Sequence, residues 1–234
     1  MILVLFDIDG TLLWTDGAGR RAIHRALIAE AGTAGPIDSY RFDGKTDPQI
    51  VTELLTLAGH PEADDEARVA AVCRRYVECL QQELDGAPPG ATRLLPGIAD
   101  LLIALEAYEA EHQALVGLLT GNMVSGADLK LRSSGVDPSR FSVGAYGSDS
   151  GRRTDLPAIA VERAMERTGR MFAGPDVVIV GDTPADVQCG RSLGARSVGV
   201  ATGFYDAAAL RAAGATHVFE SLADTSAVLA ALFG

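Results

Sequence analysis

Runs of apolar residues without polar alternation recur along the chain, and they predict buried β-strands. Strands that are apolar throughout lie in sheets covered by helices on both faces. The runs occupy residues 2–6, 115–119, 143–146, 177–180, 197–200 and 217–219. From residue 94 onward, helical patterns separate them, at about 97–111, 125–134, 156–168, 185–193 and 207–213. This alternation predicts an α/β fold with a doubly wound parallel sheet.

The stretch between the first strand and residue 94 has helical patterns and no strand-like run. Helices are expected over about 19–31, 46–59 and 63–84. The second has a sharp start, because Thr46 is an N-cap candidate and a proline follows in the first turn. Residues 85–93 are rich in glycine and proline and indicate a linker. We therefore expect a core domain of residues 1–15 and 94–234, interrupted by an all-helical domain of residues 16–93.

Charge and composition exclude several classes of protein. The formal charge of −11 and the lack of a basic stripe argue against binding to nucleic acid. The N-terminal apolar run is too short to span a bilayer and lacks the features of a signal peptide. The three cysteines form no CxxC pair, which favours buried reduced thiols. We expect a cytoplasmic protein with no membrane contact, acting as a monomer or homodimer.

Acidic residues follow two of the predicted strands, at the point where each strand ends. Asp7 and Asp9 follow the first strand, and Asp182 and Asp186 follow the strand at 177–180. Because parallel strands share their carboxyl edge, these four carboxylates are expected to converge. Like charges that close repel one another unless a cation or a proton compensates them. A divalent metal site is therefore the first inference.

Two structural alternatives stand beside that inference. Asp186 also suits the first turn of a helix, and Asp182 also suits a turn.

The segment Thr120-Gly121-Asn122, after the strand at 115–119, is a common entry to a helix. A hydroxyl and free N–H groups at a helix N-terminus nevertheless form a seat for an anion. Acids that hold a cation beside donors that hold an anion describe a phosphoryl-transfer site.

These residues resemble the motifs of the haloacid dehalogenase-like (HAD) superfamily. Residues 7–11 (DIDGT) match motif one, Thr120 matches motif two, and residues 181–186 (GDTPAD) match motif four, in the same order and spacing. The helical insertion resembles the C1-type cap of the phosphoglycolate phosphatase and β-phosphoglucomutase group. The resemblance covers essentially the whole chain and implies a Rossmann-like core carrying a cap domain.

The resemblance implies roles for the motif residues. Asp7 is the nucleophile that becomes an aspartyl phosphate, and Asp9 protonates the leaving alcohol and then activates water. Thr120, with Gly121 and Asn122, binds the transferring phosphoryl group. The implied cofactor is Mg²⁺.

The implied ligands of Mg²⁺ are four acidic residues. Asp7 and Asp182 contribute carboxylates, and Asp9 contributes its backbone carbonyl. Asp186 contributes directly or through water.

Motif three departs from the common pattern, in which a lysine lies just ahead of a proline and a helix. Residues 151–157 (GRRTDLP) contain two arginines instead. Arg153 is our candidate for the cationic role, and Arg152 is the alternative. The third possibility is that both arginines are solvated side chains of a loop and have no role in the site. Lys130, the only lysine of the predicted core domain, lies too early in the chain to be the lysine of motif three and is expected on a helix face.

The resemblance also bears on the reaction. Dehalogenases and phosphonatases carry a non-acidic residue at the position of Asp9, so a phosphomonoester phosphatase is implied here. Its substrate would be a small phosphorylated metabolite, either phosphoglycolate-like or a sugar phosphate. The alternative is a sugar-phosphate mutase, and a remote one is a non-catalytic HAD-like binding protein. Lys45, on the loop of residues 42–47, is the candidate substrate contact of the cap, unless it is only an exposed turn residue.

Overall fold

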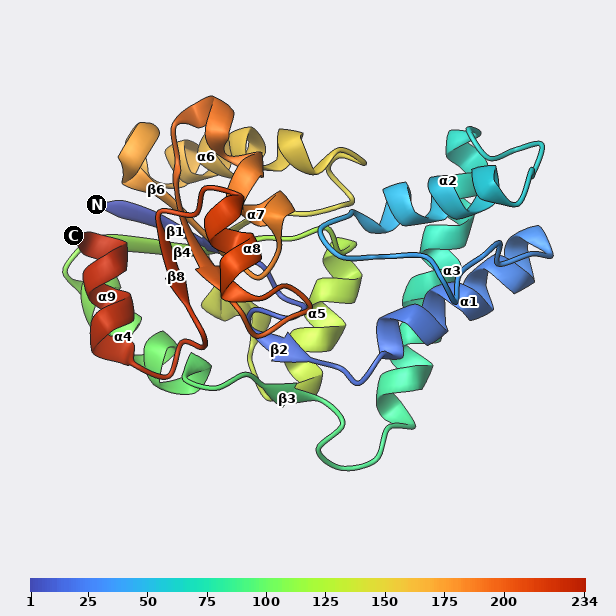
Figure 1. Cartoon of the computed structure of the whole chain (residues 1–234), viewed down its shortest axis with the longest axis horizontal. Helices are drawn as coiled ribbons and strands as arrows, with labels where there is room; N and C mark the ends of the chain where they lie inside the picture. Colours follow the sequence, from blue (N-terminus) through green and yellow to red (C-terminus); the bar gives the residue numbers. More distant parts are fainter.

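A six-stranded parallel sheet forms the centre of the structure, a computed structural model that describes all 234 residues (Figure 1). The strand order is β5-β4-β1-β6-β7-β8, and every neighbouring pair is parallel. The strands are β1 (Ile2–Phe6), β4 (Ala114–Leu119), β5 (Val143–Ala145), β6 (Val177–Gly181), β7 (Arg196–Val200) and β8 (His217–Phe219). Because β4 and β6 flank β1, the three strands that end in the predicted site residues lie side by side.

Helices cover both faces of this sheet, as the unbroken apolar strands predicted. Side chains alternate across a strand, so Val4 and Phe6 of β1 face one layer of helices and Leu3 and Leu5 face the other. The first layer contains α4 (Ile98–Ala110), α5 (Val124–Ser133) and α9 (Thr225–Phe233). The second contains α6 (Leu156–Thr168). The doubly wound α/β fold is confirmed.

Two short helices complete the carboxyl-terminal half. They are α7 (Pro184–Cys189), which follows β6, and α8 (Ala207–Ala212), which follows β7. The helix predicted over 185–193 is shorter, because α7 ends at Cys189 and a single 3-10 turn covers Arg191–Leu193. The sequence pattern also did not predict α9.

The helical insertion contains α1 (Ala18–Ala31), α2 (Asp47–Leu57) and α3 (Glu66–Asp85) and lies to the right in Figure 1. It has a hydrophobic core of its own, made of 17 buried residues between Ala18 and Leu80. Thr46 caps α2 as predicted, since its side chain accepts a hydrogen bond from the Gln49 N–H. Helix α3 begins three residues later than expected because Asp65 caps it.

Two chain crossings join the insertion to the sheet domain. There β2 (Leu13–Trp14) and β3 (Arg93–Leu94) pair as a short antiparallel ribbon that the sequence pattern did not predict. None of the helices combines the length and hydrophobicity that crossing a bilayer requires.

Candidate active site

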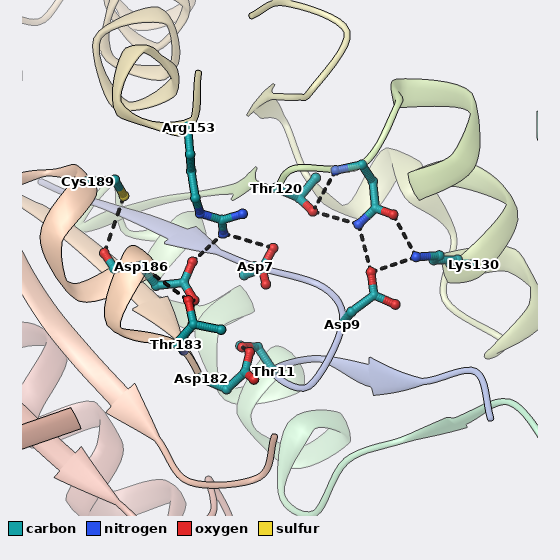
Figure 2. Close-up of polar contacts among 11 residues, drawn as sticks. Asp7, Asp9, Thr11, Thr120, Lys130, Arg153, Asp182, Thr183, Asp186 and Cys189 are labelled. Atoms are coloured by element: carbon teal, nitrogen blue, oxygen red, sulfur yellow. Dashed lines mark hydrogen bonds and ion pairs between the residues drawn. The ribbon is translucent and has the colours of Figure 1, made fainter. Parts of the chain in front are cut away.

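The carboxyl ends of β1, β4 and β6 form the floor of a cavity of about 350 Å³, and the helical insertion covers it. The sheet domain contributes side chains such as Asp7, Thr120 and Asp182, and the insertion contributes others such as Phe42 and Tyr76. Figure 2 shows the polar side chains of this floor. The cavity therefore places the predicted motif residues opposite a partly apolar roof.

Three buried carboxylates meet at this floor: those of Asp7, Asp182 and Asp186. One oxygen of each lies within 4.8 Å of the others. Burial raises the pKa of Asp7 to about 6, although nearby Arg153 opposes the shift. Burial and repulsion from the other two acids raise the pKa of Asp182 well above its ordinary value. A single neighbouring arginine does not balance three ionised carboxylates, and their hard oxygen donors fit a divalent cation.

The fourth predicted carboxylate, that of Asp9, is not part of this cluster. Its Oδ2 accepts hydrogen bonds from Asn122 Nδ2 at 2.8 Å and from Lys130 Nζ at 2.6 Å (Figure 2). The structure thus brings together three of the four acids expected to converge, and it turns the side chain of Asp9 toward β4 and α5.

The cation beside the cluster is Arg153. Its guanidinium forms a short hydrogen bond to Asp186 and lies 3.3 Å from Oδ1 of Asp7. Arg152 points the other way, since its side chain is 82% exposed and pairs with Asp155. Arg153, the candidate that the sequence favoured, lines the cavity, and Arg152, the alternative, does not.

Local contacts fix the orientation of the two acids after β6. Thr11 Oγ1 donates to Asp182 Oδ1 at 3.0 Å. A β-carbon on Gly203 would lie only 1.7 Å from the other oxygen of Asp182, so that position has room for glycine alone. Asp186 forms a capping box with Thr183 at the start of α7. The helix-capping interpretation of Asp186 and its place in the acidic cluster are therefore both correct.

The segment after β4 is also organised by hydrogen bonds. Oγ1 of Thr120 accepts from the backbone N–H of Asn122 at 3.3 Å and from its side-chain Nδ2 at 2.8 Å. The hydroxyl proton of Thr120 has no acceptor in the protein and remains free to donate. The carbonyl of Gly121 accepts a hydrogen bond from the Asp47 N–H at 2.7 Å, so the insertion contacts the sheet domain at this point.

Lys130 lies on a face of α5, as expected, but the sequence did not predict that this face meets the cavity. It projects from α5 into the cavity, is only 4% exposed, and bridges Asp9 to the Asn122 carbonyl oxygen. The sequence contained a signal for this position. Lys130 falls on the same helical stripe as Ala127 and Leu131, the buried face of α5.

Lys45 lines the cavity as predicted, but its charge is compensated. Its Nζ lies 2.6 Å from the Tyr40 hydroxyl and 2.6 Å from Oε2 of Glu53. The carboxylate of Glu53, which also belongs to the insertion, therefore balances the charge of the Lys45 ammonium group.

Asp47 is a cavity residue that the sequence indicated only as the first residue of a helix. Its buried carboxylate accepts from the Met123 N–H at 2.7 Å, at the start of α5. Burial raises its pKa to about 6, while Lys130 opposes the shift. No local sequence pattern reports this contact, because 76 residues separate its two partners.

Comparisons with known proteins agree with this architecture. Residues 156–225 match a family model described as HAD-hydrolase-like. A solved hydrolase from Pseudomonas syringae is 21% identical, with a TM-score of 0.75 and 100% of both chains covered. CbbY from Rhodobacter sphaeroides, solved in complex with phosphate, is 20% identical, with a TM-score of 0.71 and 96% of each chain covered.

A predicted phosphoglycolate phosphatase from Haemophilus somnus 129pt is 18% identical, with a TM-score of 0.66 and 98% of each chain covered. No curated protein matches the chain. The structural likenesses extend over the helical insertion as well as the sheet domain.

Proposed function

We propose that the chain is a HAD-like hydrolase that acts as a magnesium-dependent phosphatase of small phosphorylated metabolites. The family match of residues 156–225 and the similarity of its fold to the solved hydrolase and to CbbY support this proposal. The observation that carries the proposal is the buried cluster of Asp7, Asp182 and Asp186 beside Arg153. Together with the free hydroxyl proton of Thr120, it combines groups for a cation and for an anion in one cavity.

In the proposed reaction, Asp7 attacks phosphorus. As its carboxylate oxygen bonds to phosphorus, the ester P–O bond breaks and the leaving oxygen takes a proton from Asp9. The Asp9 carboxylate then accepts a proton from water, whose oxygen attacks the aspartyl phosphate and releases inorganic phosphate and free Asp7. The placement of Asp9 supports this double role, since its Oδ1 accepts no hydrogen bond from the protein.

The other motif residues bind and balance charge. We assign the phosphoryl oxygens to the Thr120 hydroxyl, the N–H groups that follow it at Gly121 and Asn122, and Arg153. The side-chain amide of Asn122 has a second task, because it contacts both Thr120 and Asp9.

Magnesium would be held by Asp7, Asp182 and the backbone carbonyl of Asp9, with Asp186 direct or through water. Asp186 already accepts from Thr183 and Arg153, which favours the water-mediated arrangement. When bound, the ion supplies positive charge that stabilises the negative charge on the phosphoryl oxygens.

We assign the cap to residues 16–93. A cap over the cavity limits the size of the ester and excludes water during transfer. Lys45, with Glu53 as its partner, is the proposed contact for the distal end of a phosphoglycolate-like or sugar-phosphate substrate. We place the enzyme in the cytoplasm as a monomer or homodimer that acts on free metabolites.

The experiment is the release of inorganic phosphate from a panel of phosphate monoesters, with and without Mg²⁺. We expect Mg²⁺-dependent turnover, its loss after chelation, and no turnover by Asp7→Asn. A protein that hydrolyses no ester with Mg²⁺ present contradicts the proposal. Transfer between positions of a sugar, with little phosphate released, identifies a mutase instead.

A further inference from the structure

Lys130 is one of only two lysines in the chain, and its ammonium group is buried at the floor of the cavity. Its Nζ lies 2.6 Å from Oδ2 of Asp9 and 2.6 Å from Oδ1 of Asn122. A buried ammonium group is costly unless it is paired and hydrogen-bonded, and Lys130 meets both conditions. Lys130 is therefore a buried, hydrogen-bonded part of the cavity and not a surface side chain.

The two donors meet on the same atom of Asp9. Asn122 Nδ2 and Lys130 Nζ both bond to Oδ2, which leaves Oδ1 without a partner in the protein. Asn122 also contacts Lys130 through its own carbonyl oxygen, so the three side chains form a closed triangle. A carboxylate held by two donors on one oxygen cannot exchange its two oxygens by rotating about its own axis without losing both bonds.

The helical insertion approaches the ammonium group. A β-carbon placed on Gly19 of α1 would lie 3.5 Å from Nζ, and the Tyr76 hydroxyl of α3 lies 3.9 Å from that same point. Residues of α1 and α3 in the insertion therefore lie close to the end of the Lys130 side chain.

We infer that Lys130 is a positioning residue for proton transfer. Together with Asn122 it fixes the Asp9 carboxylate so that Oδ1 alone faces the leaving group. This inference rests on the proposed phosphatase function. In the step that it serves, the proton passes from Asp9 Oδ1 to the leaving oxygen as the P–O bond breaks, and Lys130 keeps all three of its own protons. Rate depends on the geometry of such a donor, because a misplacement of about 1 Å costs on the order of 100-fold.

The test is the dependence of kcat/KM on the basicity of the leaving group. Alkyl phosphates expel a strongly basic alkoxide and need the proton, whereas p-nitrophenyl phosphate expels a stable anion and hardly needs it. We expect Lys130→Met to lower kcat/KM for alkyl phosphates by about 10- to 100-fold and for p-nitrophenyl phosphate by less than about 3-fold. Asp9→Asn should show the same selectivity to a larger extent.

A matched control is Arg140→Met, which removes a half-buried basic side chain paired with Glu109 outside the cavity. It should leave the leaving-group dependence unchanged even where it lowers the melting temperature. An equal loss on all esters by Lys130→Met, or no loss on any, overturns the inference. If that variant does not fold, Asn122→Ala removes the other donor from Oδ2 and must show the same selectivity, and an equal loss there overturns the inference too. A wild-type protein inactive on every ester refutes the proposed function instead.

Discussion

The guanidinium of Arg153 lies 3.3 Å from the Asp7 carboxylate and also donates to Asp186, so that one cation faces two of the three clustered acids. These groups are all buried. An ion pair in such surroundings contributes little net stability, but removing one partner leaves an uncompensated buried charge. Removal of Arg153 would therefore leave Asp7 and Asp186 without their cationic partner.

We expect Arg153→Ala to abolish turnover and to destabilise the metal-free protein by about 3–5 kcal/mol at neutral pH, because three acids then lack their cation. Added Mg²⁺ should restore more stability to this variant than it adds to the wild type. Thermal unfolding with and without Mg²⁺, together with phosphate release, measures both effects. Arg152→Ala is the control, since this exposed neighbour should behave as the wild type does.

A second prediction concerns stability against pH. The pKa of Asp7 in the folded protein is about 6, above its unfolded value of about 3.9. The folded state therefore binds more protons than the unfolded state in this range, and the metal-free protein should lose stability as pH rises from about 4 to above 6. The penalty from Asp7 alone is about 3 kcal/mol when it is complete. The raised pKa of Asp182 acts in the same direction.

Urea unfolding at pH 4 and pH 8 in the presence of a chelator measures this effect. Asp7→Asn removes the ionisable group and should be more stable than the wild type at pH 8, with the difference disappearing near pH 4. Mg²⁺ should stabilise the wild type most at pH 8, where the cluster is most negative. A metal-free wild type whose stability rises between pH 4 and pH 8 is incompatible with this account.

The parts of the site that sequence predicts are those encoded by short segments. The acids of motif one and motif four follow apolar runs directly, and parallel pairing then places Asp7 and Asp182 at the same edge. Whether Arg152 or Arg153 faces the site could not be decided in this way. They are neighbours at a short 3-10 turn, where no regular periodicity assigns a side to each residue.

Lys130 and Asp47 show two different reasons for a missed assignment. A lysine within a helix is usually solvated. The charge of Lys130 therefore favoured an exposed position, although Lys130 lies on the same helical stripe as the buried Leu131. Asp47 is buried through a contact between the insertion and the start of α5. Contacts between distant segments depend on how the two domains pack, which local patterns do not encode.

A third prediction follows from the space around Asp182. Because a β-carbon on Gly203 would lie 1.7 Å from its Oδ2, Gly203→Ala must displace this carboxylate. We expect a loss of Mg²⁺ affinity of at least about 10-fold, seen as a higher Mg²⁺ concentration for half-maximal turnover. Gly151→Ala is the matched control, since the nearest atom to its added β-carbon lies at 4.0 Å. Equal Mg²⁺ dependence in both variants would place the metal elsewhere.

The last prediction separates two roles of Asp47, which joins the insertion to the segment proposed to bind the phosphoryl group. Its N–H donates to the Gly121 carbonyl and its carboxylate accepts from the Met123 N–H, both at 2.7 Å. Asp47→Ala leaves the Met123 N–H buried without its partner and should cost about 1–3 kcal/mol. Asp47→Asn keeps an acceptor oxygen and removes a buried carboxylate whose pKa is raised to about 6.

Above pH 7, Asp47→Asn should therefore be at least as stable as the wild type, while Asp47→Ala is less stable at every pH. Hydrogen exchange at the Met123 amide should be faster than in the wild type only for Asp47→Ala, because only this variant lacks an acceptor for that N–H. The KM of Asp47→Ala should also rise, because the cap is less firmly held over the cavity in this variant. If both variants exchange at the wild-type rate, the side chain of Asp47 does not hold the insertion against α5.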